Sequence, residues 1–217
     1  MSSQVRGGTR WKRFALVMVP SIAATAAVGV GLAQGALAAS FSVSGQSFKV
    51  SADKLVGENL IQYGSVAEGS IIGEKDPEKK QKHPVTISGF SKATITNMCQ
   101  SLVTPVPGLG AITLQLRTGN KGTPAVAENI YLDVAELDAD AYFEDLDIGV
   151  AVGDGTHTTK PAPGTVADNG LFSQRAKKAT LTKVRQKAWA TTAGTFTLPD
   201  LKLRLLSGDK PCYEDEG

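Results

Sequence analysis

Residues 145–154 read DLDIGVAVGD, and two further stretches share their pattern: AITLQLRTGN at 111–120 and DLKLRLLSGD at 200–209. In each stretch aliphatic residues occupy the second, fourth and sixth positions, and glycine followed by Asn or Asp closes the pattern. This alternation is typical of a β-strand with one buried face, ending in turn residues that tolerate positive φ. We therefore predict three equivalent strands that share one interior, with the aliphatic side chains Ile112, Leu114, Leu116, Leu146, Ile148, Val150, Leu201, Leu203 and Leu205.

Each predicted strand follows a similar opening segment. KATITNMCQ at 92–100 compares with KATLTKVRQ at 178–186, and AENIYLDV at 127–134 is a looser copy. The repeated units are then 92–120, 127–154 and 178–209. Units of about thirty residues are too short to bury an apolar face alone, so they must pack on one another.

The predicted fold class is all-β, and two architectures fit the repeated strand-turn-strand units. In a β-solenoid equivalent strands lie side by side in parallel, whereas in a sandwich or barrel the units pair antiparallel. The middle unit is acidic and the last unit is basic, and their alignment places Asp133 opposite Lys183 and Asp147 opposite Lys202. Because opposite charges across neighbouring strands are stabilising, we expect these two units to be adjacent. The segment 153–170 between them is rich in Gly, Pro, Asp and Thr, which predicts a long surface loop.

The first 38 residues predict an export signal. A basic segment ending in Lys12-Arg13 precedes the uncharged, mostly apolar stretch 14–33, and Ala36-Leu37-Ala38 supplies the small-x-small pattern that signal peptidase needs. We expect cleavage after Ala38, with Ala39 as the next choice. The alternative is an uncleaved anchor helix, since twenty residues rising about 1.5 Å each can cross a hydrocarbon core of roughly 30 Å.

The basic residues keep the N-terminus cytoplasmic, so a single domain, 39–217, is expected outside the cell or on the outer face of the cytoplasmic membrane. The N-terminal segment contacts the membrane at least transiently. It holds four of the 23 basic residues, which leaves 19 basic against 21 acidic residues in the body. This balance excludes a nucleic-acid surface. A membrane protein or an envelope polymer is the expected partner.

Two cysteines, Cys99 and Cys212, occur in the whole chain. In an exported protein two thiols predict one disulfide, which here pins the C-terminus to the first repeat. A redox or metal role needs a second thiol nearby or a group of histidines, and the sequence has neither.

Candidate catalytic and metal-binding residues are few. Ser91, in GFSKA at 89–93, and the downstream His157 follow the order of a hydrolase triad, but the elbow lacks its second glycine and Ser91 enters a predicted strand. Glu136, Asp138 and Asp140 alternate along one strand face, where three carboxylates can attract Ca²⁺; a solvated face is the competing interpretation. No nucleotide-binding glycine motif is present, so no cofactor is expected.

Five stretches resemble a family of small exported proteins from Streptomyces and related actinobacteria: FSVSGQSFKVSADKLVG (41–57), KATITNMCQSLVTPVP (92–107), GLFSQRA (170–176), QKAWATTAGTF (186–196) and DKPCY (209–213). The resemblance covers essentially the whole chain after the signal segment. It implies a secreted or cell-envelope setting, sometimes beside a small multispan membrane protein. Some members carry the label cholesterol esterase, but the resemblance transfers no catalytic residues, because this sequence has no clear GxSxG.

Two functions follow from these observations. The first is an exported envelope or surface β protein with a non-enzymatic binding or structural role. The second is a secreted lipid-ester hydrolase that uses Ser91 and His157.

Overall fold

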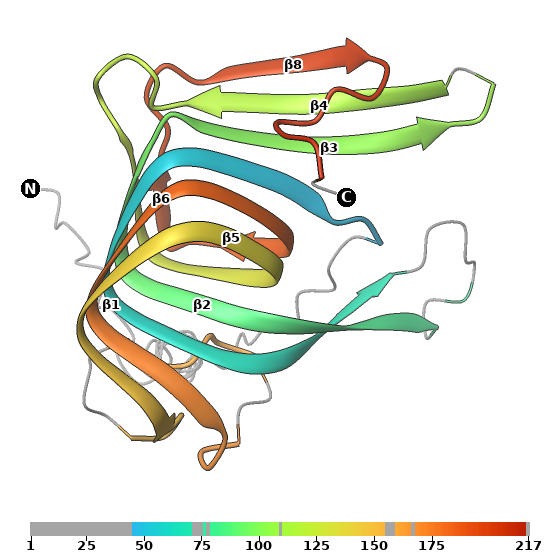
Figure 1. Ribbon diagram of the computed structural model, residues 1–217. Coiled ribbons are helices and arrows are strands. Elements are labelled where there is room, and N and C mark those ends of the chain that lie inside the picture. Colours follow the sequence, from blue (N-terminus) through green and yellow to red (C-terminus); the bar gives the residue numbers. More distant parts are fainter. Residues whose placement is uncertain are drawn as a thin grey trace, which may run out of the picture. The chain divides into compact units, whose positions relative to one another are not determined.

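The computed structural model describes residues 45–70, 76, 79–108, 110–154, 159–165 and 168–215. The predicted signal segment, with Ala38 and Ala39, lies outside these residues. The described chain is all-β, as predicted (Figure 1). Its strands are β1 (Phe48–Ser70), β2 (Lys80–Thr96), β3 (Met98–Val106), β4 (Gly110–Thr118), β5 (Ala125–Ala151), β6 (Phe172–Thr192), β7 (Thr195–Thr197) and β8 (Lys202–Ser207). None of the described residues belongs to a helix of the length and hydropathy needed to span a membrane.

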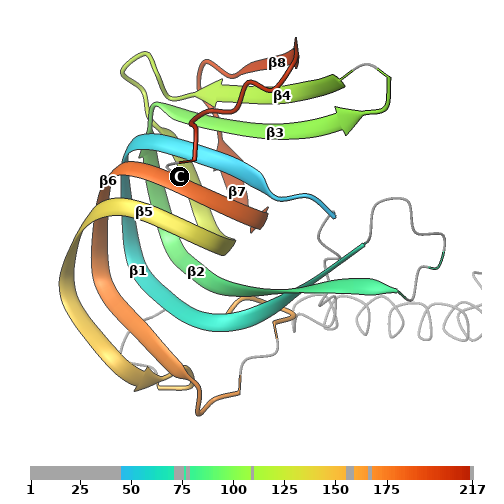
Figure 2. The same ribbon diagram turned by 45° about the vertical axis from the view of Figure 1, so that its right-hand side comes forward.

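The strands form one sheet in the order β2-β5-β6-β1-β3-β4-β8, and β7 pairs with β5. Since β1 also pairs with β2, the four long strands β1, β2, β5 and β6 close a ring, and β3, β4 and β8 extend from it as a three-stranded wing (Figures 1 and 2). Every pairing among the described strands is antiparallel. The parallel stacking of a solenoid is therefore wrong for these residues, and the antiparallel alternative is correct.

The long strands bend at residues with left-handed backbone. Asn59, Asn129 and Asp145 have φ of 52°, 50° and 51°. Each follows a Glu and precedes Leu or Ile, as in Glu58-Asn59-Leu60. Asn and Asp accept this conformation more readily than other side chains with a Cβ. The bends allow strands of up to 27 residues, against a usual five or six, to coil into a ring.

The ring interior holds the main apolar core. The face of the sheet that lines it, called here the inner face, carries buried side chains from all four ring strands, among them Leu60, Phe90, Ile130 and Leu181. Gly57 belongs to this face, and a Cβ there would lie 2.2 Å from the Phe90 ring. At this point the interior is packed so closely that one strand must approach without a side chain, although a hollow of about 210 Å³ lined by Leu60, Phe90 and Leu181 remains elsewhere on the same face.

The predicted common interior for the repeated aliphatic residues is wrong. Leu203 and Leu205 of β8 are 62% and 70% exposed, Ile148 of β5 is 63% exposed, and Leu114 of β4 is 40% exposed. On β4 the buried side chains are instead polar, including Gln115. The reason is tertiary: the C-terminal tail covers the polar face of β3 and β4, and the other face is covered only in part, where Leu116 packs against the core of the ring.

The charge pattern correctly predicts that the acidic and basic units are neighbours, because β5 pairs with β6 along most of its length. The individual pairs differ from the alignment. Lys183 lies 2.9 Å from a carboxylate oxygen of Asp140 rather than beside Asp133. Lys202, predicted to lie opposite Asp147, is on β8, which pairs with β4.

The connection from β5 to β6, predicted to be a long surface loop, is held against the ring over part of its length. Its described middle part, 159–165, packs against the opposite, outer face of the ring. The Tyr63 hydroxyl accepts a hydrogen bond from the backbone N–H of Ala162 (2.9 Å), and the Tyr131 hydroxyl donates to the carbonyl of Lys160 (3.0 Å). Burial raises the pKa of Tyr63 above its ordinary value. A second apolar cluster, which includes Tyr63 and Ala162, is thereby closed off from water.

Substitution of Gly57 by Ala tests the packing of the ring. The added methyl group overlaps the Phe90 ring, and we expect the free energy of unfolding, measured by urea denaturation, to fall by about 1 to 3 kcal/mol. Gly64→Ala is the matched control on the same strand, because a Cβ there meets no atom within 4 Å. Equal midpoints for the two variants contradict this account of the core.

Candidate functional site

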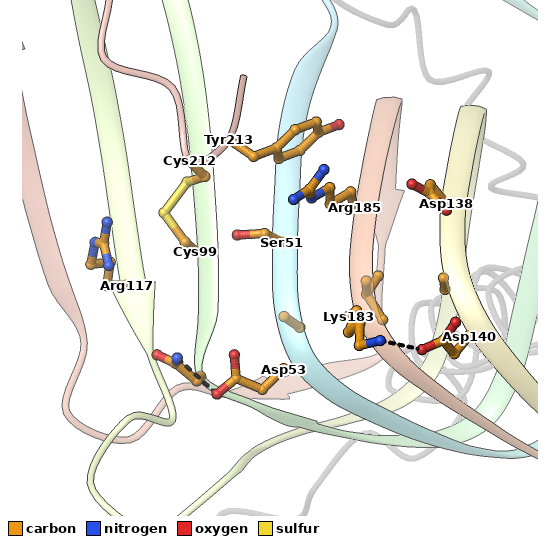
Figure 3. Close-up of a pocket in the computed structure, with 14 residues that line it drawn as sticks. Ser51, Asp53, Cys99, Arg117, Asp138, Asp140, Lys183, Arg185, Cys212 and Tyr213 are labelled. Carbon is orange, nitrogen blue, oxygen red and sulfur yellow. Dashed lines mark hydrogen bonds and ion pairs between the residues drawn. A yellow bond between two sulfur atoms is a disulfide. The ribbon is translucent and has the colours of Figure 1, made fainter. Parts of the chain in front are cut away.

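A polar hollow of about 470 Å³ lies on the outer face of the sheet, larger than two other hollows of about 210 Å³ each. It crosses the sheet from β4 of the wing through β3 and β1 to β6 and β5, and the C-terminal tail forms one wall (Figure 3). Its lining includes the charged residues Asp53, Arg117, Asp138, Asp140, Lys183 and Arg185, with Ser51, Asn97, Tyr213 and both cysteines.

The floor of the hollow follows a second row of backbone irregularities. Asn97 and Lys183 both have left-handed backbone, with φ of 52° and 54°, and they occupy the same position in the repeated segments KATITN and KATLTK. Between them the β1–β6 ladder passes from Ala52 to Lys54 without pairing Asp53. Such interruptions change the direction of side chains, and here they bring together polar groups from β1, from β6 and from the corner between β2 and β3.

The charges of the hollow balance, with three cations and three carboxylates. Lys183 and Asp140 form an ion pair of 2.9 Å, and the Asn97 amide donates to Asp53 at 2.9 Å (Figure 3). The Arg117 Nε donates to Gln115 at 3.0 Å. The arrangement therefore offers donors and carboxylate acceptors side by side in an open concavity, which suits a polar ligand carrying both charge signs.

The wall formed by the tail is fixed covalently. Cys99 and Cys212 form the predicted disulfide, across 113 positions of sequence. Backbone N–H groups of the tail also bond to the wing: Cys212 donates to the Ser101 hydroxyl and Lys210 to the Thr113 hydroxyl, both at 2.9 Å. These bonds explain why the wing buries its polar face.

Tyr213 stands at the edge of the hollow on this wall. Burial raises its pKa to about 12, and the nearby carboxylates of Asp215 and Glu136 act in the same direction. The phenol is therefore neutral at physiological pH and can both donate and accept a hydrogen bond. The Lys49 ammonium lies 5.0 Å from the centre of its ring and 2.9 Å from Asp215, which holds the tail against β1.

The structure does not bring Ser91 into this hollow. Its hydroxyl accepts a hydrogen bond from the Asn59 amide (2.9 Å) and donates one to the carbonyl of Glu58 (3.1 Å). Ser91 therefore stabilises the bend in β1. His157, the proposed base, lies outside the described residues. His83, which the structure does describe, stacks on Trp189 with ring centres 3.6 Å apart.

The three carboxylates predicted as a possible Ca²⁺ site each lie beside a basic residue of β6 instead of converging on one point. Glu136 lies opposite Lys187, Asp138 opposite Arg185, and Asp140 forms the ion pair with Lys183. Within the described residues no set of three His, Cys, Asp or Glu side chains is placed to hold a metal ion. Asp138 and Asp140 do belong to the hollow, but as parts of a mixed-charge surface.

Sequence reasoning missed Asp53, Asn97, Arg117, Lys183 and Arg185 as members of one site. The available signal was the equivalence of Asn97 and Lys183 in the repeats, which marks a shared irregularity without showing what gathers around it. The other members come from strands whose pairing is non-local.

Comparison with known families finds a model described as a family of unknown function (DUF6230), which matches residues 44–213. The chain belongs to this family. Neither the comparison with curated proteins nor that with solved structures finds a match.

Replacement of both cysteines by Ala tests the role of the tail. Loss of a cross-link spanning 113 positions is expected to lower the free energy of unfolding, measured by urea denaturation, by about 2 to 5 kcal/mol. The wall is also expected to loosen, so that a protease cleaves the tail of the double variant faster than that of the oxidised protein. A tail that remains equally protected shows that the hydrogen bonds to Ser101 and Thr113 suffice.

Proposed function

We propose that this member of a family without an assigned activity is an exported, non-enzymatic binding protein of the cell envelope. Its binding site is the outer hollow. The ligand is an envelope polymer that carries both amine and carboxylate groups.

Export is supported by the predicted signal segment and by the disulfide. Disulfides persist in oxidising surroundings outside the cytoplasm, and the Cys99–Cys212 bond ties down the wall of the proposed site. A protein whose binding site depends on such a bond fits an extracytoplasmic location.

The observation that carries the binding role is the mixed-charge lining of the hollow. Lys183 and Asp140 already satisfy each other, so the site is electrostatically balanced without a ligand. A ligand with one charge sign alone would have to break that pair without compensation, whereas one with both signs can replace each partner. Among the described lining residues Ser51 carries the aliphatic hydroxyl, and no histidine lines the hollow beside it to activate it.

Removal of two cations from the hollow tests the proposal. The purified Arg117→Gln/Lys183→Gln protein is expected to bind isolated cell-wall material, measured by co-sedimentation, about tenfold more weakly than the unsubstituted protein, because two charge-assisted contacts are lost.

Lys82→Gln/Lys177→Gln is the matched control. It also removes two cations, here two lysines that face the carboxylates of Glu68 and Asp145, but these lie away from the hollow. Equal losses in the two double variants indicate a general charge effect and contradict a site at the hollow.

The competing function, a lipid-ester hydrolase using Ser91 and His157, predicts serine-dependent turnover. We expect Ser91→Ala to leave the rate of p-nitrophenyl ester hydrolysis unchanged, because the Ser91 hydroxyl is engaged by Asn59 and Glu58. Ser51→Ala, in the hollow, is the companion variant. If the rate of ester hydrolysis falls about 100-fold or more in either variant, the protein is a hydrolase and the proposed binding role is wrong.

A further inference from the structure

The inner face of the three-stranded wing carries a group of apolar side chains that are partly or largely open to water. Six of them are defined here as the leucine face: Leu102, Ile112, Leu114, Leu203 and Leu205, with Leu201 just before β8. Leu116 belongs to the same face but packs against the main core. The pairing registers align Leu102, Leu114 and Leu205 in one row across the three strands. Three of the six are about half or more exposed: Leu201 at 49%, Leu203 at 62% and Leu205 at 70%. A contiguous apolar patch of this kind marks an interaction surface.

We propose that the leucine face docks on the outer leaflet of the cytoplasmic membrane, among the lipid headgroups and the first methylenes of the acyl chains. The inference rests on the export proposed above and adds a second surface to the protein.

The place where the described chain begins favours a membrane as the occupant. Phe48, the first residue of β1, lies on the inner face in the row of Leu102, since the β1–β3 register pairs Lys49 with Ser101. Residues 34–47 separate Phe48 from the predicted apolar segment 14–33. Fourteen residues span at most about 50 Å when fully extended. In the uncleaved-anchor alternative of the sequence analysis, rather than with cleavage after Ala38, the body therefore stays within that distance of the bilayer, and the leucine face has a lipid surface within reach.

The size of the leucine face argues against a second copy of the chain. A stable protein interface uses roughly 20 to 30 residues on each side, and the leucine face has six. A lipid surface needs no such area, because it binds an amphipathic element through a few apolar side chains at shallow depth.

The opposite side of the same strands limits that depth. Lys202 and Arg204 alternate with Leu203 and Leu205 along β8, and both cations are exposed. A strand with charges on one side cannot enter the hydrocarbon core, so the wing lies flat at the interface. The outer hollow is on the charged side, and docking leaves it directed away from the bilayer, toward the envelope polymer.

The test places a tryptophan on each side of β8 in the full-length protein. Leu205→Trp and Arg204→Trp are mixed with phosphatidylglycerol–phosphatidylcholine vesicles whose acyl chains are brominated near the headgroup. The emission of each variant above that of the unsubstituted protein, which has Trp11 and Trp189, is measured. We expect brominated lipid to reduce the added emission of Leu205→Trp about twofold or more and to leave that of Arg204→Trp unchanged.

The comparison within β8 is independent of whether residues 14–33 recruit the protein to the vesicles, because both variants retain that segment. Equal quenching of the two variants, or none in protein that sediments with vesicles, overturns the proposal. A blue-shifted Leu205→Trp emission without vesicles, unchanged by brominated lipid, assigns the face to another part of the chain or to a second copy and also overturns it. Wall binding at the hollow is measured without lipid, so either proposal can fail alone.

Discussion

Closure of four long strands into a ring is the constraint on which the rest of the structure depends. A strand of 23 or 27 residues can follow so tight a path only if its backbone turns locally, and Asn59, Asn129 and Asp145 supply left-handed turns. The strand registers align these three positions, because the glutamates before them pair with the same lysines, Lys92 or Lys178. The bends hold the apolar residues of each strand on the inner face despite the change of direction. Small side chains complete the fit, since Ala93, Ala176 and Ala179 are fully buried where the strands approach.

Left-handed backbone interruptions, which close the ring, also shape its outer surface. A second row of irregularities, at Asn97 and Lys183, brings polar side chains together, and the charges of β5 and β6 meet there. Core and hollow are thus two consequences of one pattern of strand interruptions. The disulfide at Cys99 then adds a wall that no strand pairing provides.

The tail decides which side of the wing meets water. Hydroxyls of Ser101 and Thr113 would be costly to bury alone, but the tail satisfies them with backbone N–H groups. Once the polar side is covered, the leucines on the other side are left exposed. This reversal leaves the two surfaces on which the proposals rest: the polar hollow, proposed to bind an envelope polymer, and the leucine face, proposed to dock on lipid.

Much of the fold could be predicted from the sequence because it depends on local periodicity and composition. Alternation over 111–120 and 145–154 predicted strands, the two cysteines predicted their bond, and opposite charge on the middle and last units predicted that β5 and β6 are neighbours. The glutamate that precedes each bend residue was visible in the sequence, but its meaning required the backbone.

Only the tertiary structure decided which way each strand runs, which strand it pairs with, and which of its faces is exposed to solvent. Period-two alternation shows that a strand has two unlike faces, yet it cannot tell which of them another segment will cover. At Leu114 and Gln115 the answer came from a tail some 95 residues away, bound through backbone groups that leave no mark in the side-chain sequence. The site has the same origin, since its charges are gathered by pairings between distant strands.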